Sequence, residues 1–166
     1  PGMMDTILNL GLNNQTLAAL ISQTGDPRFA YDAYRRFIQL FGKVALDTDD
    51  EKFDIHFDLV KKQNGIKADS ALKAEHLEEI SHLFLAVVLE ETGHPFPENV
   101  YEQLELSIKA VFQSWTGKRA VDYRQQFNIT PDMANGTAVN VVTMVFGNMG
   151  DDCATGVGFT RNPGTG

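Results

Sequence analysis

Apolar and polar positions recur with a helical period through most of the chain. Apolar residues return every three or four positions in segments that Gly, Pro or Asn separates, which is the spacing of amphipathic helices. Asn14 and Asp26 are expected N-caps, and Gly25 is expected to end the first helix. The predicted helices are Thr16 to Gln23, Pro27 to about Val44, Asp49 to Asn64, Asp69 to Thr92, Glu98 to Trp115, and Lys118 to Phe127.

The last thirty residues follow a different period. From Thr137 to Phe146, β-branched residues recur at period two, which predicts a strand. The turn-forming residues 147–152 follow, and Thr155 to Thr160 reads as a second short strand. We therefore predict a β-hairpin over residues 137–166 after a helical subdomain over residues 14–128. The predicted fold class is α+β, dominated by helix, within one domain spanning residues 1–166.

Composition and charge narrow the class of protein. With 166 residues and 43% apolar content, the chain suffices for one packed domain. The net charge of −8 disfavours salt-driven binding to nucleic acid. The apolar run from Leu83 to Leu89 is far shorter than the roughly 20 residues of a membrane-spanning helix, so no membrane association is expected. A single cysteine, Cys153, excludes an internal disulfide and favours an intracellular, cytoplasmic location.

Titratable clusters along the chain do not predict a metal site. His76 and His82 are six residues apart, which is not the spacing that places two zinc ligands on one helix face. The acidic residues from Asp47 to Glu51 lack the ligand spacing and the glycine of a calcium loop, and instead suit a helix start. Cys153 is interpreted as an ordinary loop thiol rather than a nucleophile. No catalytic residue is predicted.

Two segments allow both a structural and a functional interpretation. Arg35 and Arg36 could cover apolar surface with their stems and pair with nearby acids. Alternatively, a guanidinium on a rigid helix could hold phosphate oxygens. Residues 151–156 could form a plain turn, or free N–H groups and the Thr155 hydroxyl could form an anion-binding concavity. The residues alone leave both pairs of interpretations open.

Several stretches of sequence carry a family resemblance. They are PGMMDTILNLG at residues 1–11, PRFAY at 27–31, YRRF at 34–37, VFQSW at 111–115, RAVDYR at 119–124, GTAVNVVTMVFGNMG at 136–150 and TGVGFTRNPGTG at 155–166. Through them the chain resembles the nucleotide-binding domain of pyruvate, phosphate dikinase and, more distantly, that of phosphoenolpyruvate synthase. The resemblance spans the chain and is strongest at its two ends.

The resemblance implies a partial ATP-grasp domain and a set of nucleotide-binding positions. In such a domain, Met144 and Val145 would pack against and read the adenine, because methionine adapts to a flat ring. Val142 departs from the glutamine that the family usually has there, which removes one polar contact. The implied nucleotide-binding residues are Gly2, Met4, Thr6, Arg36, Val142, Met144, Val145, Thr155 and Gly156.

The resemblance also implies a parent enzyme larger than this chain. Such an enzyme would convert ATP, phosphate and pyruvate to AMP, diphosphate and phosphoenolpyruvate through a phosphohistidine, with Mg²⁺, as a cytoplasmic homodimer. The synthase would use water in place of phosphate. Pro1 is not an initiator residue, and the family's catalytic histidine and metal ligands have no match here, so we expect an excised fragment. Alone, it is expected to be inactive and to bind ATP weakly or not at all.

A function of another class is also compatible with the sequence. The acidic amphipathic helices in the middle of the chain could form a free-standing interaction module that binds a partner protein. An exposed apolar patch of several hundred Å² on one helix face would favour this alternative. Such a patch would have to be shown to bind something, because a fragment of a larger enzyme exposes apolar surface as well.

Overall fold

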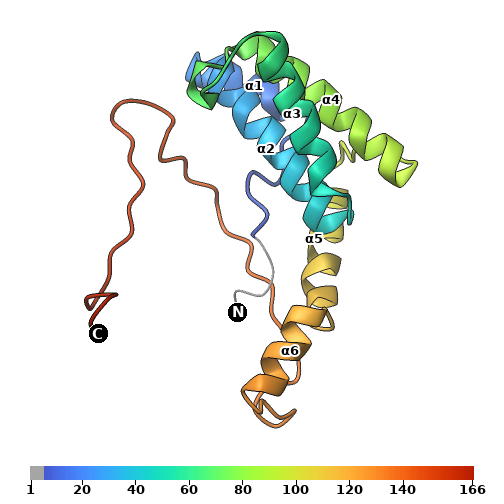
Figure 1. Cartoon of the computed structure of the whole chain (residues 1–166), viewed down its shortest axis with the longest axis vertical. Coiled ribbons are helices and arrows are strands. Elements are labelled where there is room, and N and C mark those ends of the chain that lie inside the picture. The colour runs from blue at the N-terminus through green and yellow to red at the C-terminus, as the bar shows by residue number, and fades with distance from the viewer. Residues whose placement is uncertain (1–5) are drawn as a thin grey trace.

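The computed structural model describes residues 6–166, and all of its regular elements are helical (Figure 1). In chain order, they are α1 Asn14–Thr24, α2 Pro27–Ala45, α3 Asp50–Gln63, the 3-10 turn η1 Asp69–Ala71, α4 Ala74–Thr92, α5 Val100–Ser114 and α6 Lys118–Gln126. The predicted helices therefore exist within a few residues of their expected ends. The predicted helix from Asp69 is divided, because η1 ends before α4 begins at Ala74.

Helix α2 is at the centre of the fold. It packs against α1, α3, α4 and α5, and most of its apolar stripe is buried. Phe37 and Phe41 of α2 are 0% exposed, as are Phe53 of α3 and Phe84 of α4. Edge-to-face contacts add to this apolar burial, with the Phe53 and Phe84 ring centroids 5.0 Å apart. The block formed by α1 to α4 is therefore held by aromatic side chains that converge on α2.

The helix ends follow the local rules that the sequence suggested, with one shift. The side chain of Asp26 accepts a hydrogen bond from the Phe29 N–H at 2.9 Å, directly before Pro27 in the first turn of α2. Gly25 ends α1 in the left-handed conformation that glycine adopts without strain. The N-cap of α1, however, is Asn13 rather than Asn14.

The predicted α+β class and the predicted C-terminal β-hairpin are wrong. Residues 6–166 contain no strand, and residues 137–166 form an irregular chain with turns at 147–152 and 163–165 and without ladder hydrogen bonds, as Figure 1 shows in orange and red. The ATP-grasp architecture that the resemblance implied is likewise not found in the described residues. The physical reason is that strand propensity expresses packing on a pleated surface. In this segment, neighbouring side chains on both sides of the chain are exposed to solvent, with Val141 65% and Val142 82% exposed.

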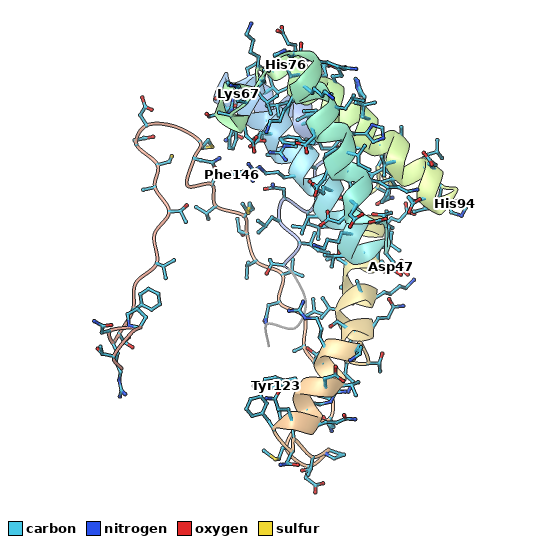
Figure 2. All side chains as sticks on the ribbon, in the orientation of Figure 1. Asp47, Lys67, His76, His94, Tyr123 and Phe146 are labelled. Carbon is cyan, nitrogen blue, oxygen red and sulfur yellow. The ribbon has the colours of Figure 1, made fainter. Side chains whose placement is uncertain are left out.

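One aromatic contact joins this extended segment to the helical block. Phe146 packs edge-to-face on Phe29 of α2 with ring centroids 5.0 Å apart, and Figure 2 shows Phe146 turned toward the helices. Beyond Phe146, the hydrogen bonds of the segment are local, such as that from the Cys153 N–H to the Gly150 carbonyl oxygen at 3.1 Å. Residues 147–166 therefore lie apart from the core.

Candidate nucleotide-binding site

A pocket of about 770 Å³ lies beside α5 and α6, and we call it the α5–α6 pocket. Its walls come from the N-terminal residues 6–10, the second half of α5, helix α6 with the loop after it, and residues 136–144. In Figure 1, the blue N-terminal segment and the orange extended segment approach each other next to these two helices. The volume lies within the roughly 300–1,000 Å³ that is typical of small-molecule sites.

Gln103 of α5 fixes the N-terminal wall of the pocket. Its side chain is 0% exposed, and its Nε2 donates to the carbonyl oxygens of Leu12 at 3.0 Å and Pro97 at 2.8 Å. Its Oε1 accepts from the Gly11 N–H at 2.9 Å. Asn9, which lines the pocket, also donates from Nδ2 to the Ala33 carbonyl oxygen of α2 at 3.3 Å. The N-terminal wall is thus held by side-chain hydrogen bonds rather than by secondary structure.

The helical wall combines apolar side chains with one stacked pair. Leu104, Ile108 and Val111 of α5 present an apolar surface to the pocket. At the junction of the helices, the Arg124 guanidinium lies over the Trp115 ring, with Cζ 4.0 Å from the ring centroid. Both residues of the pair line the pocket. This wall can therefore accept a flat apolar group and offers a cation at its edge.

The pocket brings together three of the residues that the resemblance implied. Thr6, Val142 and Met144 all line it, although they come from opposite ends of the chain. Met144 is 40% exposed and Val142 is 82% exposed. The predicted residues Gly2 and Met4 lie outside the described residues. The pocket thus brings Thr6 from the N-terminal segment beside Met144 from the C-terminal segment.

Four other predicted residues do not line this pocket: Arg36, Val145, Thr155 and Gly156. Thr155 lies against Gly147, where an added Cβ would overlap the Thr155 Oγ1. A side chain at position 147 would therefore force Thr155 to move. A role for the Thr155–Gly156 bend at phosphate stays a prediction.

Arg36 is held on α2 by an acidic neighbour. Its Nε donates to Asp32 Oδ2 at 3.0 Å, and the other Asp32 oxygen accepts from Arg35 Nε at 2.8 Å. Arg35 is buried over the Phe57 ring at 4.7 Å, and this burial lowers the pKa of its guanidinium while Asp32 opposes the shift. These contacts are those of the structural interpretation of the arginine pair. A phosphate contact by Arg36 stays a prediction.

Charged groups outside the pocket have structural contacts. Asp49 caps α3, and Asp50 accepts from Lys43 Nζ at 2.9 Å and Gln39 Nε2 at 2.9 Å. His76 Nδ1 accepts from the Lys73 N–H at 3.1 Å at the start of α4. In the part of the chain that the structure describes, no three His, Cys, Asp or Glu residues cluster as metal ligands. No helix of that part is both long and apolar enough to cross a bilayer.

The sequence reasoning missed the residues that shape the pocket. Nothing in the sequence marked Gln103 as buried, because glutamines on amphipathic helices usually face solvent. Trp115 and Arg124 stood inside the matched stretches VFQSW and RAVDYR, yet no role was assigned to either. Their spacing across a helix boundary could have suggested a contact. The stacking itself requires coordinates.

Comparison with known proteins defines the class first. The family described as "Pyruvate phosphate dikinase, AMP/ATP-binding domain" matches residues 1–166, so this chain belongs to that family. Among its relatives is pyruvate, phosphate dikinase of Entamoeba histolytica, 58% identical over 166 residues. The enzymes of the same name from Giardia intestinalis and Clostridium symbiosum are 54% and 48% identical. Each alignment covers 100% of this chain but 19% of the relative, so the chain spans about a fifth of their length.

Proposed function

We propose that the α5–α6 pocket binds the adenosine part of an adenine nucleotide, and that the chain is part of the ATP-binding domain of a pyruvate, phosphate dikinase. The observation that carries this proposal is the meeting of Thr6, Val142 and Met144 in one pocket of ligand size. The family's description names AMP and ATP, which supports the choice of ligand. Methionine and valine side chains suit a purine ring, because they pack against a flat apolar face.

The reaction that we propose belongs to the whole parent protein. It converts ATP, phosphate and pyruvate to AMP, diphosphate and phosphoenolpyruvate through a phosphohistidine, in a cytoplasmic homodimer. The relatives are named dikinases, which favours phosphate over the water that a phosphoenolpyruvate synthase uses. The chain's share of this work is to bind and orient the nucleotide. By itself it is expected to be inactive, because positioning and charge supply nearly all phosphoryl-transfer catalysis.

Magnesium, which the reaction implies, does not fit the described pocket residues. Carboxylate oxygens are the protein ligands that Mg²⁺ favours. No Asp or Glu is among the described residues that line the pocket. The charged residue among them is Arg124, which is a cation. We therefore derive no step through the metal from this chain. Its ligands would have to come from other parts of the parent.

A pair of methionine variants tests the pocket assignment. Met144→Ala and Met149→Ala remove the same side chain at positions of nearly equal exposure, 40% and 41%, but only Met144 lines the pocket. We expect Met144→Ala to weaken binding of an ATP analogue about tenfold, which corresponds to about 1.4 kcal/mol. Met149→Ala should leave the affinity unchanged. Calorimetric titration measures both.

The titration should be made in the 166-residue chain and in a polypeptide extended at both ends. The chain alone is expected to bind weakly, and the extended form more tightly. Equal losses in the two methionine variants would count against the pocket. Failure of both the chain and the folded extended form to bind the analogue would exclude the nucleotide role.

A further inference from the structure

The α5–α6 pocket has an uneven distribution of charge. Its described lining is apolar or neutral apart from one charged side chain, Arg124. The chain as a whole carries a net charge of −8, so a cation at this place is not a consequence of a basic surface. An anionic ligand group entering the pocket would meet Arg124 without a nearby lining carboxylate to repel it.

Arg124 also differs from the arginines of the helical block in its partners. Arg28 donates to the carbonyl oxygens of Leu72 and Asp69, and Arg36 is paired with Asp32. Within residues 6–166, the Arg124 guanidinium has no carboxylate or hydrogen-bond acceptor, and its contact is the Trp115 ring. The nearest acid along α6, Asp122, is paired with Lys118 instead. None of the described residues therefore accepts a hydrogen bond from the Arg124 guanidinium.

The stacked geometry prepares Arg124 for a phosphate. A guanidinium is a planar fork with its N–H groups around its rim, and the indole that Arg124 Cζ lies over at 4.0 Å does not accept hydrogen bonds from those groups as a carboxylate would. Those donors match phosphate oxygens in a bidentate contact. The indole also restricts the rotamers of a long side chain, so less conformational entropy is lost on binding. Trp115 thus acts as a support for the cation.

We propose that Arg124, stacked on Trp115, binds phosphate oxygens of the nucleotide that occupies the α5–α6 pocket. The identity of the ligand as a nucleotide rests on the proposed function, whereas the phosphate contact rests on Arg124 itself. Arg124 then supplies the one cation among the described residues that line the pocket. If the pair only joined α6 to α5, replacing Arg124 would not weaken phosphate binding more than replacing another arginine of α6.

The experiment titrates three ligands into the 166-residue chain: ATP, adenosine and tripolyphosphate. Calorimetry measures affinity, and fluorescence reports on the site itself because Trp115 is the chain's one tryptophan. The variant is Arg124→Gln. Its matched control is Arg119→Gln, which removes the same charge from an exposed position of α6 outside the pocket lining.

Arg124→Gln is expected to weaken tripolyphosphate and ATP by at least about tenfold, the size of a lost charged hydrogen bond. Adenosine affinity should stay the same, and Arg119→Gln should behave as the wild-type chain. Equal effects of the two substitutions on tripolyphosphate would overturn the proposal. So would the absence of any tripolyphosphate binding to the wild-type chain.

The three ligands separate the failure of this inference from that of the proposed function. If adenosine does not bind while tripolyphosphate binds through Arg124, the nucleotide assignment fails and the phosphate contact stands. If adenosine binds and Arg124→Gln does not change tripolyphosphate affinity, the nucleotide assignment stands and the phosphate contact fails. Should Arg124→Gln not fold, Arg124→Lys keeps the charge and loses the fork. It is then expected to lower tripolyphosphate affinity about threefold, and wild-type affinity in that variant would overturn the proposal.

Discussion

At the scale of single residues, Tyr34 is an unusual member of the core. Its side chain is 2% exposed, and within the described residues its hydroxyl has no hydrogen-bond partner. Burial, together with the negative charge of Glu98, raises the pKa of Tyr34 to about 12 from its ordinary value of 10.0. The folded state therefore holds the phenol in its neutral form.

We predict that stability falls in alkali because of Tyr34. Between pH 10 and 12, the unfolded chain releases the phenolic proton while the folded chain keeps it, so the free energy of unfolding falls by about 1.4 kcal/mol per pH unit. The contribution is fully present below pH 10. Tyr34→Phe removes this loss, and at pH 7 it should not destabilise the chain, since no hydrogen bond is broken. Urea unfolding of both proteins at pH 7, 10 and 11.5 measures the difference. Parallel pH profiles would contradict the prediction.

The residue scale also shows which parts of the site could be predicted. Thr6, Val142 and Met144 were chosen through the family resemblance, and the structure places them in one pocket. Period and propensity alone did not single them out, because a methionine in an apolar run is usually core. The partner of a charged side chain was harder to predict. Asp32 and Arg36 are four residues apart on one helix, a spacing that allows the ion pair, whereas nothing in the sequence shows that Arg124 has no acidic partner in the described residues.

At the scale of elements, the junction between α5 and the N-terminal segment determines the geometry of the pocket. Gln103 bonds to Gly11, Leu12 and Pro97 from a fully buried position. Buried backbone groups need such partners, because a carbonyl or N–H left unpaired away from water costs about 1–3 kcal/mol. One side chain therefore substitutes for the secondary structure that residues 6–12 lack.

We predict that Gln103→Met destabilises the chain and loosens the pocket. Methionine keeps the volume but leaves three backbone groups without their partner, so the free energy of unfolding should fall by about 3 kcal/mol. Adenosine binding should weaken as well, because residues 6–10 line the pocket. Gln113→Met, at an exposed position of the same helix, is the control, and its effect should stay within about 0.5 kcal/mol. Thermal and urea unfolding measure stability. Equal stabilities of the two variants would show that the Gln103 bonds contribute little.

The elements themselves were largely predictable where the signals are local. Apolar spacing and end signals such as Asp26-Pro27 and Gly25 act within a few residues, so most helix ends followed from the sequence. The cap of α1 and the start of α4 at Ala74 were exceptions. The strands did not. A strand needs a neighbour to pair with its backbone, and the alternating residues 137–146 find none within residues 6–166. The strand that alternation predicted over residues 137–146 was therefore wrong, and so was the hairpin.

At the scale of the whole molecule, the chain divides into a packed helical block and a C-terminal segment that contributes little to the core. Phe146 packs on Phe29, and residues 136–144 line the pocket. Residues 147–166 form hydrogen bonds only with one another in the described structure. Stability and ligand binding should therefore depend on different parts of this segment.

Two truncations test this division, one ending at Phe146 and one ending at Gly136. Removal of residues 147–166 should leave Tm within about 2 °C of the whole chain, since it breaks no contact with the core. Removal of residues 137–166 also deletes the contact between Phe146 and Phe29. Aromatic pairs of this kind contribute about 1 kcal/mol, so this deletion should lower Tm more than the shorter one does. Circular dichroism measures both. A large loss of Tm in the shorter deletion would show that residues 147–166 pack on the helices.

The same truncations separate the residues that contact adenosine from the residues predicted to contact phosphate. The chain ending at Phe146 should keep adenosine binding because Val142 and Met144 remain, whereas the chain ending at Gly136 should lose it with the pocket wall. ATP distinguishes the predicted phosphate residues. If Thr155 and Gly156 contact phosphate, the chain ending at Phe146 will bind ATP more weakly than the whole chain while binding adenosine equally. If Arg124 is the main phosphate contact in this chain, both affinities will survive the deletion.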